Sequence, residues 1–254
     1  MASTLNGKFV WYELTTPATA DSRRFYGEVL GWDSRDAQIP NIDYSLMSIG
    51  GEDVAGFLGL SDGMQAGWLG YICVDDLDAA FAKAQKDGAA ACVPINPIPG
   101  VGRFAILADP TGAAFGLLEY AADFAKPTLR STGIPGHGYW RELHTNDREK
   151  AFAFYSGLFG WSEKDRMAMG PDEFYQLFGD ETPHGGIFNN PKAKSPHWHF
   201  YFRVEDIDAA QARLEKAGGK IVAEAMQVPG GTWVIQAQDP EGTAFALEGT
   251  RDTK

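Results

Sequence analysis

The apolar positions of the chain first alternate with the period of a β-strand and then recur with the period of an α-helix, and this order occurs several times. Residues 9–15 alternate and are rich in aromatic and β-favouring residues, which predicts a strand. Residues 19–30 predict a helix that ends at Gly31, because glycine readily adopts the left-handed terminating conformation. The apolar face of this helix comprises Phe25, Tyr26, Val29 and Leu30.

The second half of the chain repeats the first. Residues 11–32 match residues 140–161 at an offset of 129, with eight identities in 22 positions. At an offset of 130, residues 68–80 match 198–210 and residues 109–117 match 239–247. We therefore predict a tandem duplication. The two domains are predicted at residues 7–120 and 137–249, with a linker at residues 121–136 that is rich in Pro, Gly, Ser and Thr.

Each copy also contains the strand-helix order twice. A strand at residues 68–74 precedes a helix at residues 78–87, and short alternating segments fill the rest. The sequence thus predicts an α+β fold made of four βαβββ modules.

Composition and charge restrict the function classes. The chain is 44% hydrophobic and 22% charged and carries a net charge of -12, so nucleic acids and anionic membranes are not expected as partners. It has two cysteines, Cys73 and Cys92, which fits a reducing compartment. No apolar run is long enough to span a bilayer and the first residues lack a signal pattern, so we expect a cytoplasmic protein.

Three repeated motifs resemble those of a known family. They are FYxxxLGW at the end of the first helix, with its copy FYxxxFGW, the VDD-x-D turn with its copy VED-x-D, and DPxGxxFxL near the end of each copy. In these motifs the chain is similar to the vicinal oxygen chelate superfamily, which includes glyoxalases, bleomycin resistance proteins and extradiol dioxygenases. The resemblance implies paired βαβββ modules whose sheets curl around a cavity in each half.

The resemblance also locates the positions where metal-dependent relatives carry their ligands. In this chain those positions hold Trp11, Trp140, Gly116, Ala246, Leu69 and His199. Indole has one N–H donor and cannot ligate a cation, and among these side chains only that of His199 is a metal ligand. We therefore expect no metal cofactor at the usual place.

Candidate catalytic and ligand-binding side chains are instead concentrated in the second copy, which contains all five histidines. Alternation along residues 197–204 places four polar side chains on the face expected to line a cavity. These are His197, His199, Tyr201 and Arg203. By the same parity, Glu142 and His144 share a face with Trp140, and Glu248 shares one with Ala246. His184, in a glycine-rich segment, is expected to lie in a loop.

Three hypotheses follow from these positions. The first is a relocated divalent metal site made of His144 and His199 with Glu142 or Glu248. The second is metal-independent acid-base catalysis by His199 with Glu142 or Glu248. The third is a binding cup for a small molecule. Its candidate ligand-binding residues are Trp11, Glu13, Trp140, Glu142, His144, His197, Tyr201 and Arg203.

The sequence favours a protein that binds or modifies a small organic molecule without the family's usual metal site. The alternative is a metal-dependent lyase or dioxygenase with a rearranged centre in the second domain. Because four modules can pair within one chain, we expect either a monomer or a homodimer.

Overall fold

The computed structural model describes residues 5–126, 133–170 and 173–251, so residues 127–132 of the predicted linker lie outside the described part. The first copy contains β1 (Phe9–Thr16), α1 (Thr19–Leu30), β2 (Asp33–Asp36), β3 (Tyr44–Ile49), β4 (Glu52–Gly59), β5 (Gly67–Cys73), α2 (Leu77–Lys86), β6 (Ala90–Ile98), β7 (Gly102–Ala108) and β8 (Ala114–Tyr120). The second contains β9 (Gly138–Thr145), α3 (Arg148–Phe159), β10 (Ser162–Ala168), β11 (Phe174–Gly179), β12 (Pro183–Asn189), β13 (His197–Asp206), α4 (Ile207–Lys216), β14 (Lys220–Gln227), β15 (Trp233–Gln238) and β16 (Ala244–Thr250).

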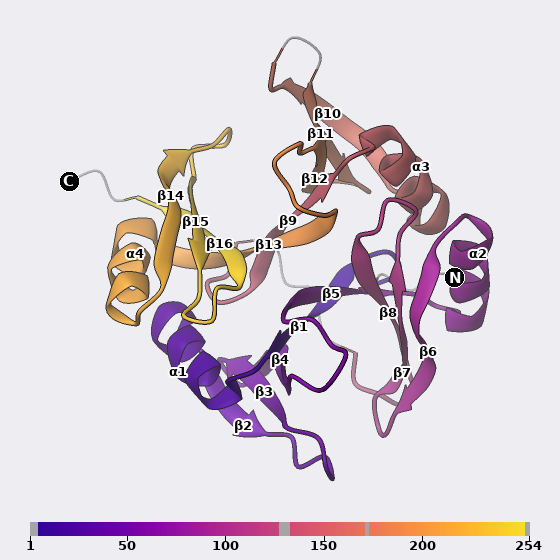
Figure 1. Cartoon of the computed structure of the whole chain (residues 1–254), viewed down its shortest axis with the longest axis horizontal. Coiled ribbons are helices and arrows are strands. Elements are labelled where there is room, and N and C mark those ends of the chain that lie inside the picture. The colour runs from indigo at the N-terminus through magenta and orange to yellow at the C-terminus, as the bar shows by residue number, and fades with distance from the viewer. Residues whose placement is uncertain (1–4, 127–132, 171–172, 252–254) are drawn as a thin grey trace. The chain divides into compact units, whose positions relative to one another are not determined.

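These elements confirm the predicted α+β architecture of four βαβββ modules. The strands form two open eight-stranded mixed sheets (Figure 1). One sheet has the order β2-β3-β4-β1-β5-β8-β7-β6 and the other β10-β11-β12-β9-β13-β16-β15-β14. The two orders are identical once the copies are superimposed, so the duplication seen in the sequence extends to the topology.

Local sequence signals explain where the helices begin and end. Helices α1 and α3 stop at Gly31 and Gly160, both in the left-handed conformation with φ of 74°. The carboxylates of Asp76, Asp147 and Asp206 accept the N–H group of the third residue that follows, at the starts of α2, α3 and α4. No helix in the described ranges has the length and apolarity needed to cross a membrane.

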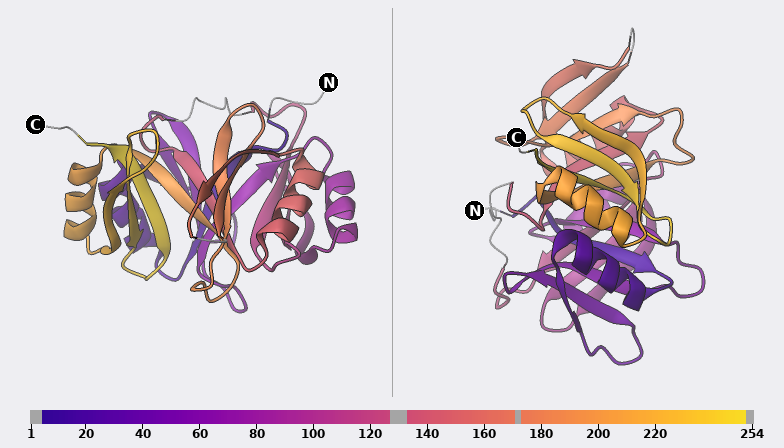
Figure 2. Two further views of the ribbon diagram at one scale, coloured as in Figure 1. Left: turned by 90° about the horizontal axis from the view of Figure 1, so that it is seen from above. Right: turned by 90° about the vertical axis from the view of Figure 1, so that its left-hand side faces the viewer.

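Packing groups the modules into two compact units, and each unit draws on both copies. Unit 1 contains Met1–Val10, Leu69–Leu129 and Arg141–Trp198. Unit 2 contains Trp11–Trp68, Arg130–Trp140 and His199–Lys254. Helices α2 and α3 lie side by side in unit 1, as α1 and α4 do in unit 2 (Figure 2). The division into two consecutive domains at residues 7–120 and 137–249, joined by a linker at residues 121–136, stays a prediction.

The core of unit 1 is built on the family-like motifs. Tyr155, from the Phe-Tyr pair of α3, donates a hydrogen bond of 2.9 Å to the buried carboxylate of Asp109 in the DPxG turn. Trp198 donates to the same tyrosine hydroxyl at 2.9 Å, and Trp161 donates to the Gly7 carbonyl at 2.8 Å. These repeated motif residues therefore hold the unit together.

Unit 2 uses the equivalent residues in the same way. Tyr26 of α1 donates to Asp239 at 3.2 Å and accepts from Trp68 at 3.1 Å. Trp32 donates to the Gly136 carbonyl at 2.7 Å. Burial raises the pKa of Tyr26 well above its usual value, and the charge of Asp239 adds to the effect, so this tyrosine stays a hydrogen-bond donor.

Candidate functional site

A cluster of polar side chains in unit 1 is centred on Glu142 in β9. Tyr175 of β11 donates a hydrogen bond of 2.8 Å to Oε1 of this carboxylate, and Nε2 of His144 lies 3.2 Å from Oε2. The side chains of Glu142 and His144 are 14% and 16% exposed. The structure therefore brings together two residues that the sequence placed on one face of β9, and it adds Tyr175.

A glycine in β12 makes the Tyr175–Glu142 contact possible. Gly186 pairs with Glu142 in the parallel register of β12 and β9, so it lies between the tyrosine and the carboxylate. A β carbon on Gly186 would lie 2.1 Å from the ring of Tyr175. Only glycine leaves the space for the ring to cross β12.

The hydrogen bonds around His144 define its tautomer. The amide nitrogen of Asn190 lies 2.8 Å from Nδ1, and the amide oxygen of Asn190 accepts from the Lys192 backbone at 3.0 Å. The amide therefore donates to Nδ1, which must be unprotonated, so Nε2 carries the proton and donates to Glu142. Phe188 packs against the imidazole, with ring centroids 4.6 Å apart.

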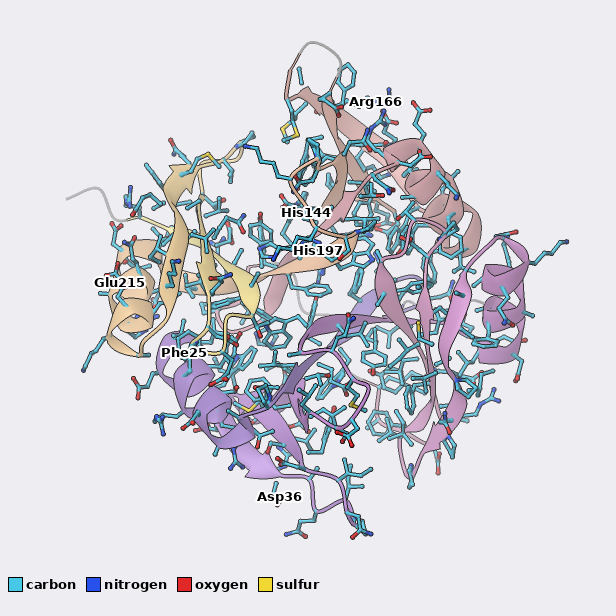
Figure 3. All side chains as sticks on the ribbon, viewed as in Figure 1. Phe25, Asp36, His144, Arg166, His197 and Glu215 are labelled. Atoms are coloured by element: carbon cyan, nitrogen blue, oxygen red, sulfur yellow. The ribbon has the colours of Figure 1, made fainter. Side chains whose placement is uncertain are left out.

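His197, at the start of β13, completes this cluster. Its ring lies 4.7 Å from that of His144 at an angle of 31°, and the two side chains are neighbours in Figure 3. Nδ1 donates to the Ser195 carbonyl at 2.9 Å, so Nε2 bears the lone pair. Burial lowers the pKa of His197 below its usual 6.5, and the nearby His144 lowers it further, while the Ser195 carbonyl and Glu142 raise it. His197 is therefore neutral at pH 7.

In unit 2, β1 carries a related arrangement without histidine. Tyr44 of β3 donates to Oε2 of Glu13 at 3.0 Å and accepts from Nε1 of Trp11 at 3.1 Å. Gly56 pairs with Glu13, and a β carbon on it would lie 2.0 Å from the Tyr44 hydroxyl. The Tyr-Gly-Glu arrangement is thus present in both copies.

The predicted base His199 lies in unit 2 within an amide network. Its Nε2 donates to the amide oxygen of Gln236 at 2.6 Å, and the amide nitrogen of Gln236 donates to the Tyr201 hydroxyl at 2.5 Å. Tyr201 also belongs to an apolar cluster with Val234 and Ala246, against which Trp140 packs. Nε2 of His199 is therefore a hydrogen-bond donor.

Arg203 and Glu248 bind each other. Arg203 Nη1 contacts both carboxylate oxygens of Glu248, whose side chain is 2% exposed. The Arg203 guanidinium also lies over the ring of Tyr139, 5.3 Å from its centroid. These two predicted site residues thus form a buried ion pair, as the parallel register of β13 with β16 requires.

The residues at the family's ligand positions do not fit a metal ion. Trp11 donates to Tyr44, Trp140 packs on the Tyr201 cluster, and Gly116 is covered by the ring of Tyr71, which a β carbon would meet at 2.2 Å. Among the residues that the structure describes, no group of three or more His, Cys, Asp or Glu side chains could hold a metal ion. The Glu142–His144 pair is engaged in its own hydrogen bonds.

The expectation that His184 lies in a loop is wrong. This residue belongs to β12 and is 8% exposed, packed against Trp161 and Phe178. Its Nε2 is buried without a hydrogen-bond partner in the described residues. Burial lowers the pKa of His184 to about 4, with smaller effects of Lys8 and Arg141 in the same direction.

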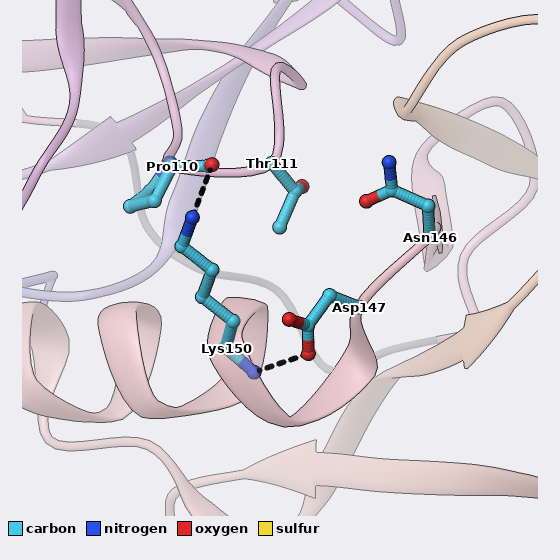
Figure 4. Close-up of a pocket in the computed structure, with 5 residues that line it drawn as sticks. All are labelled: Pro110, Thr111, Asn146, Asp147 and Lys150. Atoms are coloured by element: carbon cyan, nitrogen blue, oxygen red, sulfur yellow. Dashed lines mark hydrogen bonds between the residues drawn. The ribbon is translucent and has the colours of Figure 1, made fainter.

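A surface pocket of about 390 Å³ lies at the start of α3. Its lining is Pro110, Thr111, Asn146, Asp147 and Lys150 (Figure 4). Asp147 accepts the Lys150 backbone N–H at 3.0 Å, and the Lys150 ammonium donates to the Pro110 carbonyl at 3.0 Å. These groups cap the helix and join it to the turn between β7 and β8.

Sequence reasoning did not identify Tyr44, Tyr175, Asn190 or Gln236. A signal existed for the two tyrosines, because Tyr44 with Gly56 and Tyr175 with Gly186 occupy corresponding places in the two copies. Asn190 and Gln236 have no such counterpart, and only the folded strands bring them beside the histidines.

Comparisons with known proteins agree with this architecture. Residues 140–247 match the model of the glyoxalase/bleomycin resistance protein/dioxygenase superfamily. The Mycobacterium tuberculosis protein named "Putative glyoxylase CFP32" is 31% identical, covering 93% of this chain and 92% of the relative. The Streptomyces "Anthracycline biosynthesis protein DauV" is 29% identical, covering 97% and 94%.

Solved structures share the fold at low sequence identity. The Mn(II)-bound glyoxalase from Novosphingobium aromaticivorans superimposes with a TM-score of 0.68 at 17% identity, covering 99% of this chain and 84% of that one. The 2,2',3-trihydroxybiphenyl 1,2-dioxygenase from Sphingomonas wittichii gives a TM-score of 0.68 at 14% identity, covering 98% and 91%. The four-module architecture, the repeated motifs and near-full-length similarity to a relative 31% identical show that this chain belongs to the glyoxalase/bleomycin resistance protein/dioxygenase superfamily, the vicinal oxygen chelate proteins.

Proposed function

We propose that the protein binds a small organic molecule beside β9 and β13 of the second copy and moves a proton on it without a metal ion. His197 accepts the proton at Nε2. The charge of Glu142 favours the imidazolium that forms, and His144 donates to Glu142 and helps to hold this carboxylate in place. We therefore assign the general base to His197 instead of His199, because Nε2 of His199 donates to Gln236.

The geometry of His197 is the observation that carries this proposal. The Ser195 carbonyl fixes the proton on Nδ1 and leaves the lone pair on Nε2. A lowered pKa keeps the ring unprotonated at neutral pH, as a general base requires. The charge of Glu142 acts in the opposite direction and stabilises the protonated ring, so the base can accept a proton and return it.

The surroundings favour a planar, conjugated ligand. Phe188 packs between His144 and Tyr175, with ring centroids at 4.6 and 5.6 Å, so aromatic faces border the polar groups. Relatives 29% identical are named anthracycline biosynthesis proteins, which supports a polycyclic aromatic ligand. Location in the cytoplasm and a monomeric or dimeric state remain predictions.

The metal-dependent alternative has weaker support. His144 is bound to Glu142 and Asn190, His199 to Gln236, and Glu248 to Arg203. The likeness to metal-dependent glyoxalases and dioxygenases lies in the fold, at 14–17% identity. We therefore assign no step to a metal ion.

Deuterium exchange tests the proposal directly. The probe is anthrone, a planar tricyclic ketone with an acidic methylene group, kept under argon in D2O with a chelator and followed by NMR. We expect the protein to accelerate exchange of the methylene protons and His197→Gln to lower the rate by about 10²-fold or more. The control is His137→Gln, a histidine of the other unit. Exchange no faster than in buffer, or unchanged in His197→Gln, would contradict the proposal.

A further inference from the structure

Arg148, the first residue of α3, is a buried charge with few partners. Its side chain is 10% exposed, and Nη1 donates a hydrogen bond of 2.7 Å to the amide oxygen of Gln176 in β11. Nη2 donates to Glu149 at 3.4 Å, but the side chain of Glu149 is 85% exposed. Nε is buried without a hydrogen-bond partner among the residues that the structure describes. Because a guanidinium removed from water with so few partners costs free energy, packing alone does not account for it.

Gln176 connects Arg148 to strand β11. Its buried amide is held on both sides, because Oε1 accepts from Arg148 and Nε2 donates to Glu163 of β10 at 2.9 Å. Tyr175 precedes Gln176 on the same strand, and successive side chains of a strand point to opposite faces. Gln176 therefore faces α3, while Tyr175 donates to Glu142 on the other face.

The start of α3 also holds the end of β12. The backbone N–H of Arg148 donates to Oδ1 of Asn189 at 2.8 Å, and α3 packs on this strand. The next residue, Asn190, is the one whose amide donates to Nδ1 of His144. Arg148 thus contacts both segments that hold the Glu142–His144 pair, β11 through its side chain and β12 through its backbone.

The first copy forms the same sheet without this set of polar residues. Its strands have the same order, and Tyr44 donates to Glu13 as Tyr175 does to Glu142. Five positions nevertheless differ together, holding Arg148, Gln176, Asn189, Asn190 and His144 in the second copy and Thr19, Ser45, Gly59, Leu60 and Thr15 in the first. The polar set therefore accompanies the histidine and is not required by the topology.

We propose that Arg148 is a positioning residue for proton transfer by His197. By holding β11 through Gln176, it keeps Tyr175 on Glu142, the carboxylate whose charge favours the protonated form of His197. A guanidinium suits this role because its planar fork fixes the directions of its N–H donors. This inference rests on the proposed function of His197, but the contact that it describes can be measured without that function.

Arg148→Met tests the assignment, because methionine keeps an apolar stem and removes the charge and the donors. The first readout is the pKa of His197, from NMR titration of the histidine ring signals. We expect it to shift downward, as in Glu142→Gln but by less, because Glu142 without the Tyr175 contact is held less closely to the ring. The second readout is anthrone exchange. Its rate at saturating anthrone should fall about tenfold with a nearly unchanged half-saturation concentration, since a displaced group impairs the reaction more than the binding.

Arg148→Lys and Arg23→Met are the control variants. Lysine retains the charge and a donor for Gln176, so it should recover part of both readouts. Arg23 of α1 donates to Ser45 at 3.2 Å at the corresponding place in unit 2, so Arg23→Met should leave both readouts at the wild-type values. If Arg148→Met does not fold, the double variant with Gln176→Leu replaces both partners by apolar groups, which proteins tolerate better, and it should give the same shifts.

The outcomes separate positioning from stability. A lower melting temperature of Arg148→Met with an unchanged pKa of His197 and an unchanged exchange rate would overturn the proposal, because Arg148 would then serve folding alone. An equal change in Arg23→Met would overturn it as well. If the wild type catalyses no exchange, the proton-transfer function is wrong, whereas a lowered pKa of His197 in Arg148→Met would still show that Arg148 positions Glu142.

Discussion

The hydroxyl of Tyr175 reaches Glu142 across Gly186, whose position would place a β carbon 2.1 Å from the tyrosine ring. The same relationship joins Tyr44 to Glu13 across Gly56. One structural device, a tyrosine that lies over a glycine and donates to a carboxylate, thus occurs in both copies, and the second copy adds His144 beside the carboxylate.

Gly186→Ala should destabilise the protein and displace Tyr175. The added methyl group overlaps the ring, and overpacking of this kind costs about 1–3 kcal/mol. Urea unfolding measures the change. Gly170→Ala is the control, since a β carbon there meets nothing within 4 Å. Equal stability of the two variants would show that the glycine is not needed for the contact.

Glu142→Gln should lower the pKa of His197 further. The negative charge of Glu142 raises that pKa, opposing the burial that depresses it, so neutralising the carboxylate removes one of the opposing effects. NMR titration of the histidine ring signals gives the value in both proteins. A higher pKa of His197 in the variant would contradict the arrangement of these two groups.

His184 should make the protein less stable in mild acid. Its folded-state pKa is about 4 against 6.5 in the unfolded chain, so between these values the unfolded state binds more protons. The contribution of His184 to the free energy of unfolding is fully present above pH 6.5, and it falls by about 3 kcal/mol in total as the pH decreases through 4. We expect the free energy of unfolding of His184→Leu, followed in urea from pH 7 to pH 4, to fall less steeply than that of the wild type. Parallel curves would rule out His184 as the source.

Tyr155→Phe should destabilise the core of unit 1. The substitution removes the donor to Asp109 and the acceptor for Trp198, leaving buried polar groups unpaired at a cost of about 1–3 kcal/mol each. Tyr26→Phe should act in the same way in unit 2, through Asp239 and Trp68. Thermal unfolding of both variants checks the expectation, and a change within about 0.5 kcal/mol in either would count against this role of the motif tyrosines.

The sequence predicted the parts of this protein that depend on local order. Apolar periodicity gave the four βαβββ modules, and Gly31 and Gly160 marked the helix ends that the structure confirms. The parity of β13 correctly placed Trp198, Phe200, Phe202 and Val204 in the core. Such features need only the sequence, because strand and helix periods decide which side chains share a face.

The tertiary structure decided which modules pack together and which side chains meet. Both copies carry the same Phe-Tyr helix and the same DPxG turn, so an apolar pattern alone could pair Tyr155 with either Asp109 or Asp239. The fold pairs it with Asp109, from the other copy. The hydrogen bonds of His197 to Ser195 and of His199 to Gln236 likewise depend on loop path and on the register of β15. The chain's own alternation determined which residues share a strand face, whereas partners such as Asp109 for Tyr155 and Gln236 for His199 came from segments far away in sequence, whose placement only the assembled sheets determine.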